Sequence, residues 1–345
     1  MRKYIFALPL CAALLPFLAH AHEVYVLSPM QVASDTLAAP FNMVQIALDN
    51  RYQFMFWGFI AFVVISTIFF VSIFRVFENW LDPFFARTKR YAPLICRITV
   101  GLGLLAGAYY QASYGPELPY SAAFGAFAPV MRILVVAVGV SLIAGLWVRA
   151  AAFIALSLFA YAAWRNGIYM LTYANYLGEF VVLFALSTHI PGARVSGKDI
   201  WARLTRALSP YEFAIVRIAF GISLLFAALY AKVLHNNLAL QIATLPLAGH
   251  AHSIAYYFGF EPHFLVLGAA IIEVLIALFF ILGIEIRWTC IFLEFWLALS
   301  LWWFGEAVWP HLILIGIPIA LFLWGYDQYS LEGRYFKRGA REPVL

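Results

Sequence analysis

The chain has 345 residues, of which 65% are hydrophobic and 11% are charged, and its formal net charge is +5. Soluble globular proteins carry roughly a quarter charged residues, so this chain lacks the charge to cover a body exposed to water. The composition therefore excludes a cytosolic enzyme, a nucleic-acid-binding protein and a disordered protein, and it predicts a membrane protein. We attribute the positive charge to membrane topology, because the Lys and Arg residues flank apolar runs.

The N-terminus has the three parts of a secretory signal peptide. A basic pair at residues 2–3 is followed by an apolar run to Leu18 and then by Ala19-His20-Ala21. This order predicts a signal peptide over residues 1–21, which leaves His22 as the mature N-terminus. An uncleaved membrane anchor is the alternative, and the two prolines within the apolar run argue against it because proline disrupts a spanning helix.

The segment that follows the signal peptide is expected outside the membrane. Its stretch from Phe41 to Leu48 is amphipathic and could form a short helix. Such a helix lies in the membrane interface with its apolar face inward. Two hypotheses stay open for it, a cover over a site and a plain tether.

Nine apolar stretches after the signal peptide are candidates for spanning helices, which need about 20 mainly apolar residues. They run over Gln53–Phe74, Pro93–Tyr110, Pro129–Val148, Ala150–Trp164, Ile168–Thr188, Tyr211–Tyr230, His263–Ile284, Trp288–Phe304 and Val308–Trp324. Lys and Arg gather in alternate connections, which predicts a bacterial inner membrane protein with its mature N-terminus outside and its C-terminus in the cytoplasm. The expected fold is all-α and polytopic.

Two parts of the chain read as copies of one four-helix unit. The helix from Arg97 to Tyr110 and the helix from Arg217 to Tyr230 share the spacing of their Arg, Gly, Leu and Tyr residues. Both begin on the cytoplasmic side, so we expect two parallel four-helix bundle repeats. The predicted organisation is a signal peptide (1–21), an extracytoplasmic segment (22–52), a first transmembrane helix with a cytoplasmic loop (53–90), a first repeat (91–194), a cytoplasmic linker (195–209), a second repeat (210–330) and a basic cytoplasmic tail (331–345).

Cysteine usage limits the redox chemistry of the chain itself. Once the signal peptide is removed, Cys96 and Cys290 remain, both at predicted cytoplasmic helix ends. Disulfides form on the oxidising side of a membrane, so we expect none here. The sequence also lacks the Cys-x-x-Cys pair with which a protein shuttles electrons through its own thiols.

The second repeat resembles the DoxX-like family of four-helix membrane proteins. The residues that carry the resemblance are Arg217, Gly221, Lys232, the helix Gly268 to Gly283 with Glu273 inside it, Arg287, Trp324-Gly325-Tyr326-Asp327 and Ser330-Leu331-Glu332. It covers Tyr211 to Arg338 and, more weakly, Pro93 to Arg194. Members of this family have been linked to quinone-linked and thiol-linked membrane redox systems. The resemblance therefore implies a redox subunit whose electron-carrying cofactors lie mainly on a partner. The duplication, the extra first helix and the signal peptide depart from the family pattern and leave the choice of partner open.

Ionisable side chains within the predicted spans are the candidate catalytic residues. A charge inside hydrocarbon is costly, so such residues usually pair or line a polar path. We expect proton transfer by Glu179 and Glu273, charge and orientation from Arg97, Arg217 and Arg287, and a role at the outer mouth for His311. The alternative is that these charges are structural and only join helices.

Three functional hypotheses follow. The first is a membrane subunit of a quinone-linked or thiol-linked redox system, with the lipid bilayer and a redox protein as partners and quinone as the ligand. The second is a transporter or a copper-handling protein, because His250 and His252 form an HxH pair and a free His22 could bind metal through its amine and ring. The third is an assembly scaffold without catalytic activity.

Overall fold

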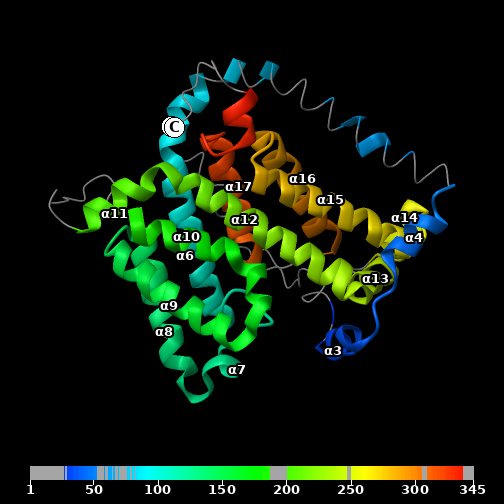
Figure 1. Cartoon of the computed structure of the whole chain (residues 1–345). Coiled ribbons are helices and arrows are strands. Elements are labelled where there is room, and N and C mark those ends of the chain that lie inside the picture. The colour runs from blue at the N-terminus through cyan, green and yellow to red at the C-terminus, as the bar shows by residue number, and fades with distance from the viewer. Residues whose placement is uncertain are drawn as a thin grey trace.

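The protein is built from helices (Figure 1). The computed structural model describes residues 27, 29–52, 83–186, 200–246, 250–304 and 309–336, together with separate positions between 58 and 81. Within these ranges the regular elements are α-helices and short 3₁₀ or π-helical segments, and no strand is formed there. The expected all-α fold is thus confirmed for the described residues. The predicted signal peptide, His22, the tail beyond Phe336 and most of the first predicted span lie outside them.

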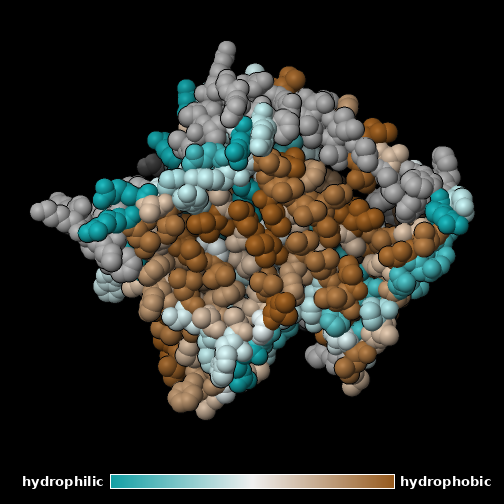
Figure 2. All heavy atoms as spheres, in the orientation of Figure 1, coloured by the Kyte–Doolittle hydropathy of each residue, from teal (hydrophilic) through white to brown (hydrophobic). Residues whose placement is uncertain are grey.

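Five helical stretches are long and apolar enough to cross a membrane. They are Pro83–Tyr110, Tyr120–Ala144, Val148–Ala185, Arg203–Leu234 and Pro262–Leu282, and Trp309–Trp324 is a shorter apolar helix. Hydrophobic residues dominate the face shown in Figure 2, and hydrophilic residues gather at its margins, near α11 (Ile200–Leu208) and near α4 (Met43–Asp49). This distribution is that of a protein with lipid as its solvent.

Helices occur at the predicted positions from Pro93 onward. The first four are α6 (Ala92–Tyr110), α8 (Ala128–Ala144), α9 (Val148–Asn166) and α10 (Ala174–Leu186), which we call the first unit. The next four are α12 (Glu212–Leu229), α15 (Pro262–Leu282), α16 (Ile286–Phe304) and α17 (Leu312–Trp324), which we call the second unit. The helix α10 begins later than expected, because the 3₁₀ segment η3 (Gly167–Tyr173) turns the chain back so that α10 packs beside α9.

The third and fourth helices of the two units recur at one interval along the chain, whereas the first helices, α6 and α12, begin 120 residues apart. An interval of 138 residues separates Val148 from Ile286 and also Ala174 from Leu312, the first residues of the third and fourth helices. The units differ in the connection between their first two helices. The first unit has the short helix α7 (Tyr120–Phe124) there, and the second has α13 (Asn236–Thr244) and α14 (Ile254–Phe258).

Within each unit, a glycine on the first helix allows close contact with the second. A Cβ atom at Gly101 of α6 would lie 2.7 Å from Cγ1 of Ile143 near the end of α8. A Cβ atom at Gly221 of α12 would lie 2.7 Å from Cγ1 of Ile281 in α15. Small residues let membrane helices approach closely. The glycines noted in the sequence therefore act in helix packing, and they do so in the same way in both units.

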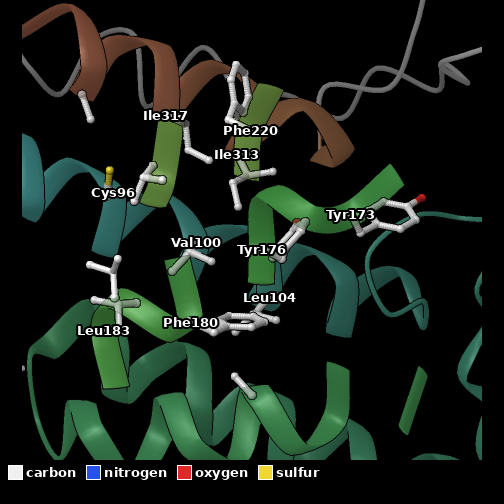
Figure 3. Close-up of a cluster of buried hydrophobic side chains, with 14 of the residues drawn as sticks. Cys96, Val100, Leu104, Tyr173, Tyr176, Phe180, Leu183, Phe220, Ile313 and Ile317 are labelled. Atoms are coloured by element: carbon white, nitrogen blue, oxygen red, sulfur yellow. The ribbon is translucent and has the colours of Figure 1, made fainter. Parts of the chain in front are cut away.

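The two units exchange contacts through their last helices. The helix α10 packs along α12, and α17 packs along α6, so the fourth helix of each unit lies against the first helix of the other. A Cβ atom at Gly178 of α10 would lie 2.5 Å from Cβ of Ala219, and one at Gly316 of α17 would overlap the side chain of Thr99. Buried side chains of both units form one continuous hydrophobic core, part of which is drawn in Figure 3.

The segment before the first unit lies against the second. Its short helix α4 falls within the stretch where an amphipathic helix was expected, and Met43 and Ile46 pack on Phe264 of α15. Just before this helix, the backbone of Phe41 exchanges two hydrogen bonds with the buried side chain of Asn236, at 3.1 and 2.8 Å. The segment is therefore fixed against α13 and α15.

Candidate functional site

A cavity of about 200 Å³ lies inside the second unit. Its walls come from α12, α13, α15 and α16 and from the residues that begin α17, and most of the lining side chains are apolar. The ionisable and hydroxyl side chains in the wall are Lys232, Glu273, Ser300 and His311, and two indole rings, Trp296 and Trp303, also line it. An apolar cavity with a few convergent polar groups is the usual form of a small-molecule site.

The charged centre of this cavity is an ion pair. The Nζ atom of Lys232 lies 2.9 Å from Oε2 of Glu273, and the two side chains are 8% and 24% exposed. Lys232 belongs to η5 (Tyr230–Leu234), a π-helical turn that ends α12, whereas Glu273 lies in the middle of α15. Turns of this kind inside helices are frequent at functional sites. Glu273 therefore has a charged companion, and that companion is a lysine of the neighbouring helix.

His311 connects this cavity with a second one. It ends the 3₁₀ segment η6 (Trp309–His311) just before α17, and only 1% of its surface is exposed. The residue lines both the cavity of about 200 Å³ and a smaller cavity of about 30 Å³ between the two units. His311, which the sequence predicts at an outer mouth, is buried in the wall of the cavity that Lys232 and Glu273 also line.

The matching position in the first unit is nearly filled. A cavity of about 20 Å³ remains there, and Val135, which lies at the same interval before Glu273, stands in its wall. The rings of Tyr114, Tyr120 and Phe124 occupy the surrounding space. Burial raises the pKa of Tyr114 well above its usual value, and the charges of neighbouring tyrosines add to this effect, so the ring is a neutral filler. The large cavity is thus a property of the second unit.

Arg217 lies away from the cavity. It is fully buried, and its Nε atom lies 3.1 Å from Oδ2 of Asp327. Its Nη1 atom donates hydrogen bonds to the carbonyl oxygens of Phe280 and Ile281 at the end of α15. Capping these carbonyls satisfies groups that a helix end leaves without partners. Arg217 therefore closes the end of α15 and does not contact Glu273, which explains why Asp327 follows the last helix.

Arg287 and Arg97 also lie at helix ends. The Nε atom of Arg287 donates a hydrogen bond of 3.0 Å to the carbonyl oxygen of Phe322, and its guanidinium carbon lies 3.8 Å from the centre of the Phe85 ring. Arg97 is buried against Gly145, and its Nε atom has no hydrogen-bond partner among the described residues. Neither arginine lines the cavity.

Glu179 occupies a different place from Glu273. It lies in α10 with 1% of its surface exposed, and neither of its carboxyl oxygens has a conventional hydrogen-bond partner within the described part of the chain. The thiol of Cys96 lies beside it, and the carboxyl group of Glu212 is near enough for the two charges to interact. Among the described residues, no arginine forms a hydrogen bond with Glu179.

The two predicted metal ligands among the described residues, His250 and His252, each stack on an aromatic ring. The ring of His250 stacks on Trp303 with centroids 4.4 Å apart, and the ring of His252 stacks on Tyr256 with centroids 4.0 Å apart. His22 lies outside the described residues. Among the residues that the structure covers, no group of three His, Cys, Asp or Glu side chains is arranged to hold a metal ion.

Comparison with protein-family models, with curated proteins and with solved structures found no match for this chain. The site therefore has to be interpreted from its own geometry. Sequence reasoning identified Glu273 and His311 as site candidates, but it named Lys232 only among the residues that carry the family resemblance and left it out of the site. The signal in the sequence for this ion pair was a lysine directly after one apolar helix and a glutamate in the middle of another.

Proposed function

We propose that the protein is an integral membrane subunit of a redox system and that the cavity of the second unit binds the ring of a quinone. The observation that carries this proposal is the Lys232–Glu273 ion pair, with an Nζ to Oε2 distance of 2.9 Å, in the wall of an apolar cavity of about 200 Å³. The volume is below the 300 to 1,000 Å³ usual for whole drug-sized ligands, so it suits a ring whose apolar tail extends into lipid.

The polar groups of the cavity match the chemistry of such a ring. A quinone presents two carbonyl oxygens, which accept hydrogen bonds, and its reduced form presents two hydroxyl groups, which donate them. Lys232 supplies a charged donor, Glu273 supplies an acceptor that can take a proton, and His311 can do either. The indole rings of Trp296 and Trp303 offer flat apolar surfaces for the ring.

The source of the electrons is assigned to a partner protein. Cys96 and Cys290 are both buried and unpaired, so thiol exchange would have to occur on that partner. The resemblance to DoxX-like proteins also supports placing the electron-carrying groups on a partner protein. In this proposal the arginines Arg97, Arg217 and Arg287 hold helix ends in position, and the ionisable residues that contact the quinone are Glu273, Lys232 and His311.

We further propose that the chain consists of two copies of one four-helix unit preceded by one transmembrane helix, which gives nine spans. The shared interval of 138 residues between the third and fourth helices of the two units and the matched glycine contacts support the duplication. The distribution of Lys and Arg supports an inner membrane location with the mature N-terminus outside. Because the matching cavity of the first unit is filled, this architecture holds one quinone per chain.

Calorimetric titration of the full chain in lipid nanodiscs with a short-tailed quinone tests the proposal. We expect saturable binding with one molecule per chain. Hydrogen bonds to charged groups contribute about 1.5–3 kcal/mol. Since about 1.4 kcal/mol corresponds to a tenfold change in affinity, Lys232→Met and Glu273→Gln should each weaken binding about tenfold or more.

Glu294 provides the matched control. It is a half-buried carboxyl group on α16 that does not line the cavity, so Glu294→Gln should bind the quinone as the unmodified protein does. Absence of saturable binding, or equal affinity in Glu273→Gln and Glu294→Gln, would overturn the proposal. Copper bound by the purified protein and lost on replacement of His250 and His252 would favour the metal-handling hypothesis instead. A partner that co-purifies while quinone fails to bind would favour the scaffold.

A further inference from the structure

The small cavity between the two units has the size and lining of a water site. It measures about 30 Å³, which is comparable to the volume of one water molecule in the liquid. His311, Tyr176 and Thr172 line it, and His311 also faces the larger cavity. The hydroxyl groups of Tyr176 and Thr172 are both buried without a hydrogen-bond partner among the described residues. A buried water needs two to four polar partners, and this cavity offers them.

A second set of polar groups continues from this cavity along α10. Glu179 follows Tyr176 by three positions, which places the two side chains on the same side of the helix. Figure 3 shows Tyr176 on α10, with Cys96 on the neighbouring helix α6 at the other end of the drawn cluster. Gly178, the neighbour of Glu179, packs against the backbone of Ile215 in α12, and Glu212, three positions before Ile215, is partly exposed. Polar groups therefore extend from that end of the bundle to the large cavity.

The matching interface between α6 and α17 shows that helix packing does not require these groups. Its residues at the corresponding positions are Ile317 for Glu179, Leu314 for Tyr176, Val216 for Cys96 and Ala92 for Glu212. All four are apolar, and that interface has the same close glycine contact as its counterpart. A carboxyl group without a hydrogen-bond partner costs free energy when buried. The polar residues occur at the interface between α10 and α12 and not at the matching one, so we infer that they have a role other than packing.

We propose that a proton path runs between the two units and joins the end of the bundle at which α12 begins to the large cavity. In order from that end, its members are Glu212, Glu179, Tyr176 and His311, with one water in the small cavity between the last two. The path deepens the proposed function and rests on it for its purpose. Reduction of a quinone to the quinol takes up two electrons, which the redox partner supplies, and two protons, which this path delivers.

A second polar branch toward the opposite end is better explained as structural. Tyr173 also lines the small cavity, but its hydroxyl group donates a hydrogen bond to Glu117, and Tyr169 donates another at 3.1 Å to the same oxygen. Figure 3 shows the hydroxyl oxygen of Tyr173 pointing away from the drawn cluster. Glu117 is thus held by two tyrosines in the connection after α6, whereas Glu179 has no such partners.

Infrared spectroscopy of the full chain in nanodiscs, without any quinone, tests the path. A buried carboxyl group without a counter-charge is held as the neutral acid, which absorbs apart from carboxylates and shifts in heavy water. We expect a band that is lost in Glu179→Gln and displaced in Glu179→Asp, and that exchanges rapidly after transfer to heavy water. Because the path opens at both ends, Glu212→Gln and Tyr176→Phe should each slow the exchange, and the double variant should slow it at least tenfold.

The carboxyl band of Glu294, identified by its loss in Glu294→Gln, is the internal control and should exchange at the same rate in all variants. Thermal unfolding curves show whether each variant is folded. Exchange of the Glu179 band that is unchanged in the folded double variant, or absent in the unmodified protein, would overturn the path. Since no quinone is present, this result is independent of the binding experiment, and failure of one proposal can be told from failure of the other.

Discussion

Lys232 and Glu273 meet across the second unit, with the lysine at the end of α12 and the glutamate in the middle of α15. Their distance is 2.9 Å and their side chains are 8% and 24% exposed, so the lysine is buried and the glutamate is partly buried. Breaking a buried pair leaves one charge without compensation, which costs more than removing both charges together. Stability and ligand binding should therefore respond differently to single and double substitutions at these two positions.

Replacement of the pair gives the first prediction. We expect Lys232→Met to lower the free energy of unfolding by up to about 3 kcal/mol, because the partly buried Glu273 then lacks its partner in an apolar cavity. The double variant Lys232→Met/Glu273→Gln should regain a large part of this loss but should not bind quinone. Thermal unfolding measured with a thiol-reactive dye on the buried residues Cys96 and Cys290 checks this. Strictly additive effects of the two substitutions would contradict it.

The Arg217–Asp327 pair gives a second prediction, which separates structure from function. Asp327→Asn should lower the free energy of unfolding by about 3–5 kcal/mol, because Arg217 is fully buried. Quinone affinity per folded molecule should stay unchanged, since neither residue lines the cavity. Arg97→Met is the comparison, and it should cost less because Arg97 has no ion pair among the described residues. A loss of affinity in folded Asp327→Asn would show that the arginine acts on the site.

The contact between α10 and α12 gives a third prediction. Gly178→Ala places a Cβ atom where Ala219 already stands, so we expect a loss of about 1–3 kcal/mol in the free energy of unfolding. Adding Ala219→Gly removes the clash and should restore most of the stability. The corresponding pair in the other unit, Gly316→Ala with Thr99→Gly, should behave in the same way. Failure of either second substitution to rescue its partner would contradict the close packing.

The start of α15 gives a prediction about pH. Burial alone would raise the pKa of Glu261, but hydrogen bonds from the ring of His263 and from the backbone N–H of Phe264 outweigh this effect and lower the pKa below its usual value. A lowered pKa means that the carboxylate stabilises the fold fully above the unfolded-state value of about 4.3, and that this contribution is lost as the pH falls through the folded-state value.

Glu261→Ala tests this relationship. At neutral pH the substitution should cost about 1 kcal/mol, the usual effect of removing the side chain that caps a helix. The difference in melting temperature between this variant and the unmodified protein should shrink as the pH falls from about 7 to about 3. Glu261→Gln keeps an acceptor without the charge and should lie between the two. A difference that stays constant over the whole pH range would contradict the role of the carboxylate.

The helices could be predicted from the sequence and their partners could not. A spanning helix must be a continuous apolar run, so the stretch Pro93–Tyr110 differs from α6 by one residue. The connection between Lys232 and Glu273 depends on how α12 and α15 pack, and no local spacing carries that information. For the same reason the sequence identified Arg217 as a candidate for the site, although it lies at a helix end with Asp327.

The fourth helix of each unit packs on the first helix of the other, and this arrangement delays folding until most of the chain has been synthesised. Because α17 lies against α6, the helix α6 leaves the ribosome early but gains this contact only after α17 has been synthesised. Contacts between such distant parts of a chain form slowly. Throughout translation, the groove around Thr99 stays unfilled within the bilayer. A premature stop before Gly316 would therefore leave α6 without the helix that packs along it, so the damage would extend beyond the missing last helix.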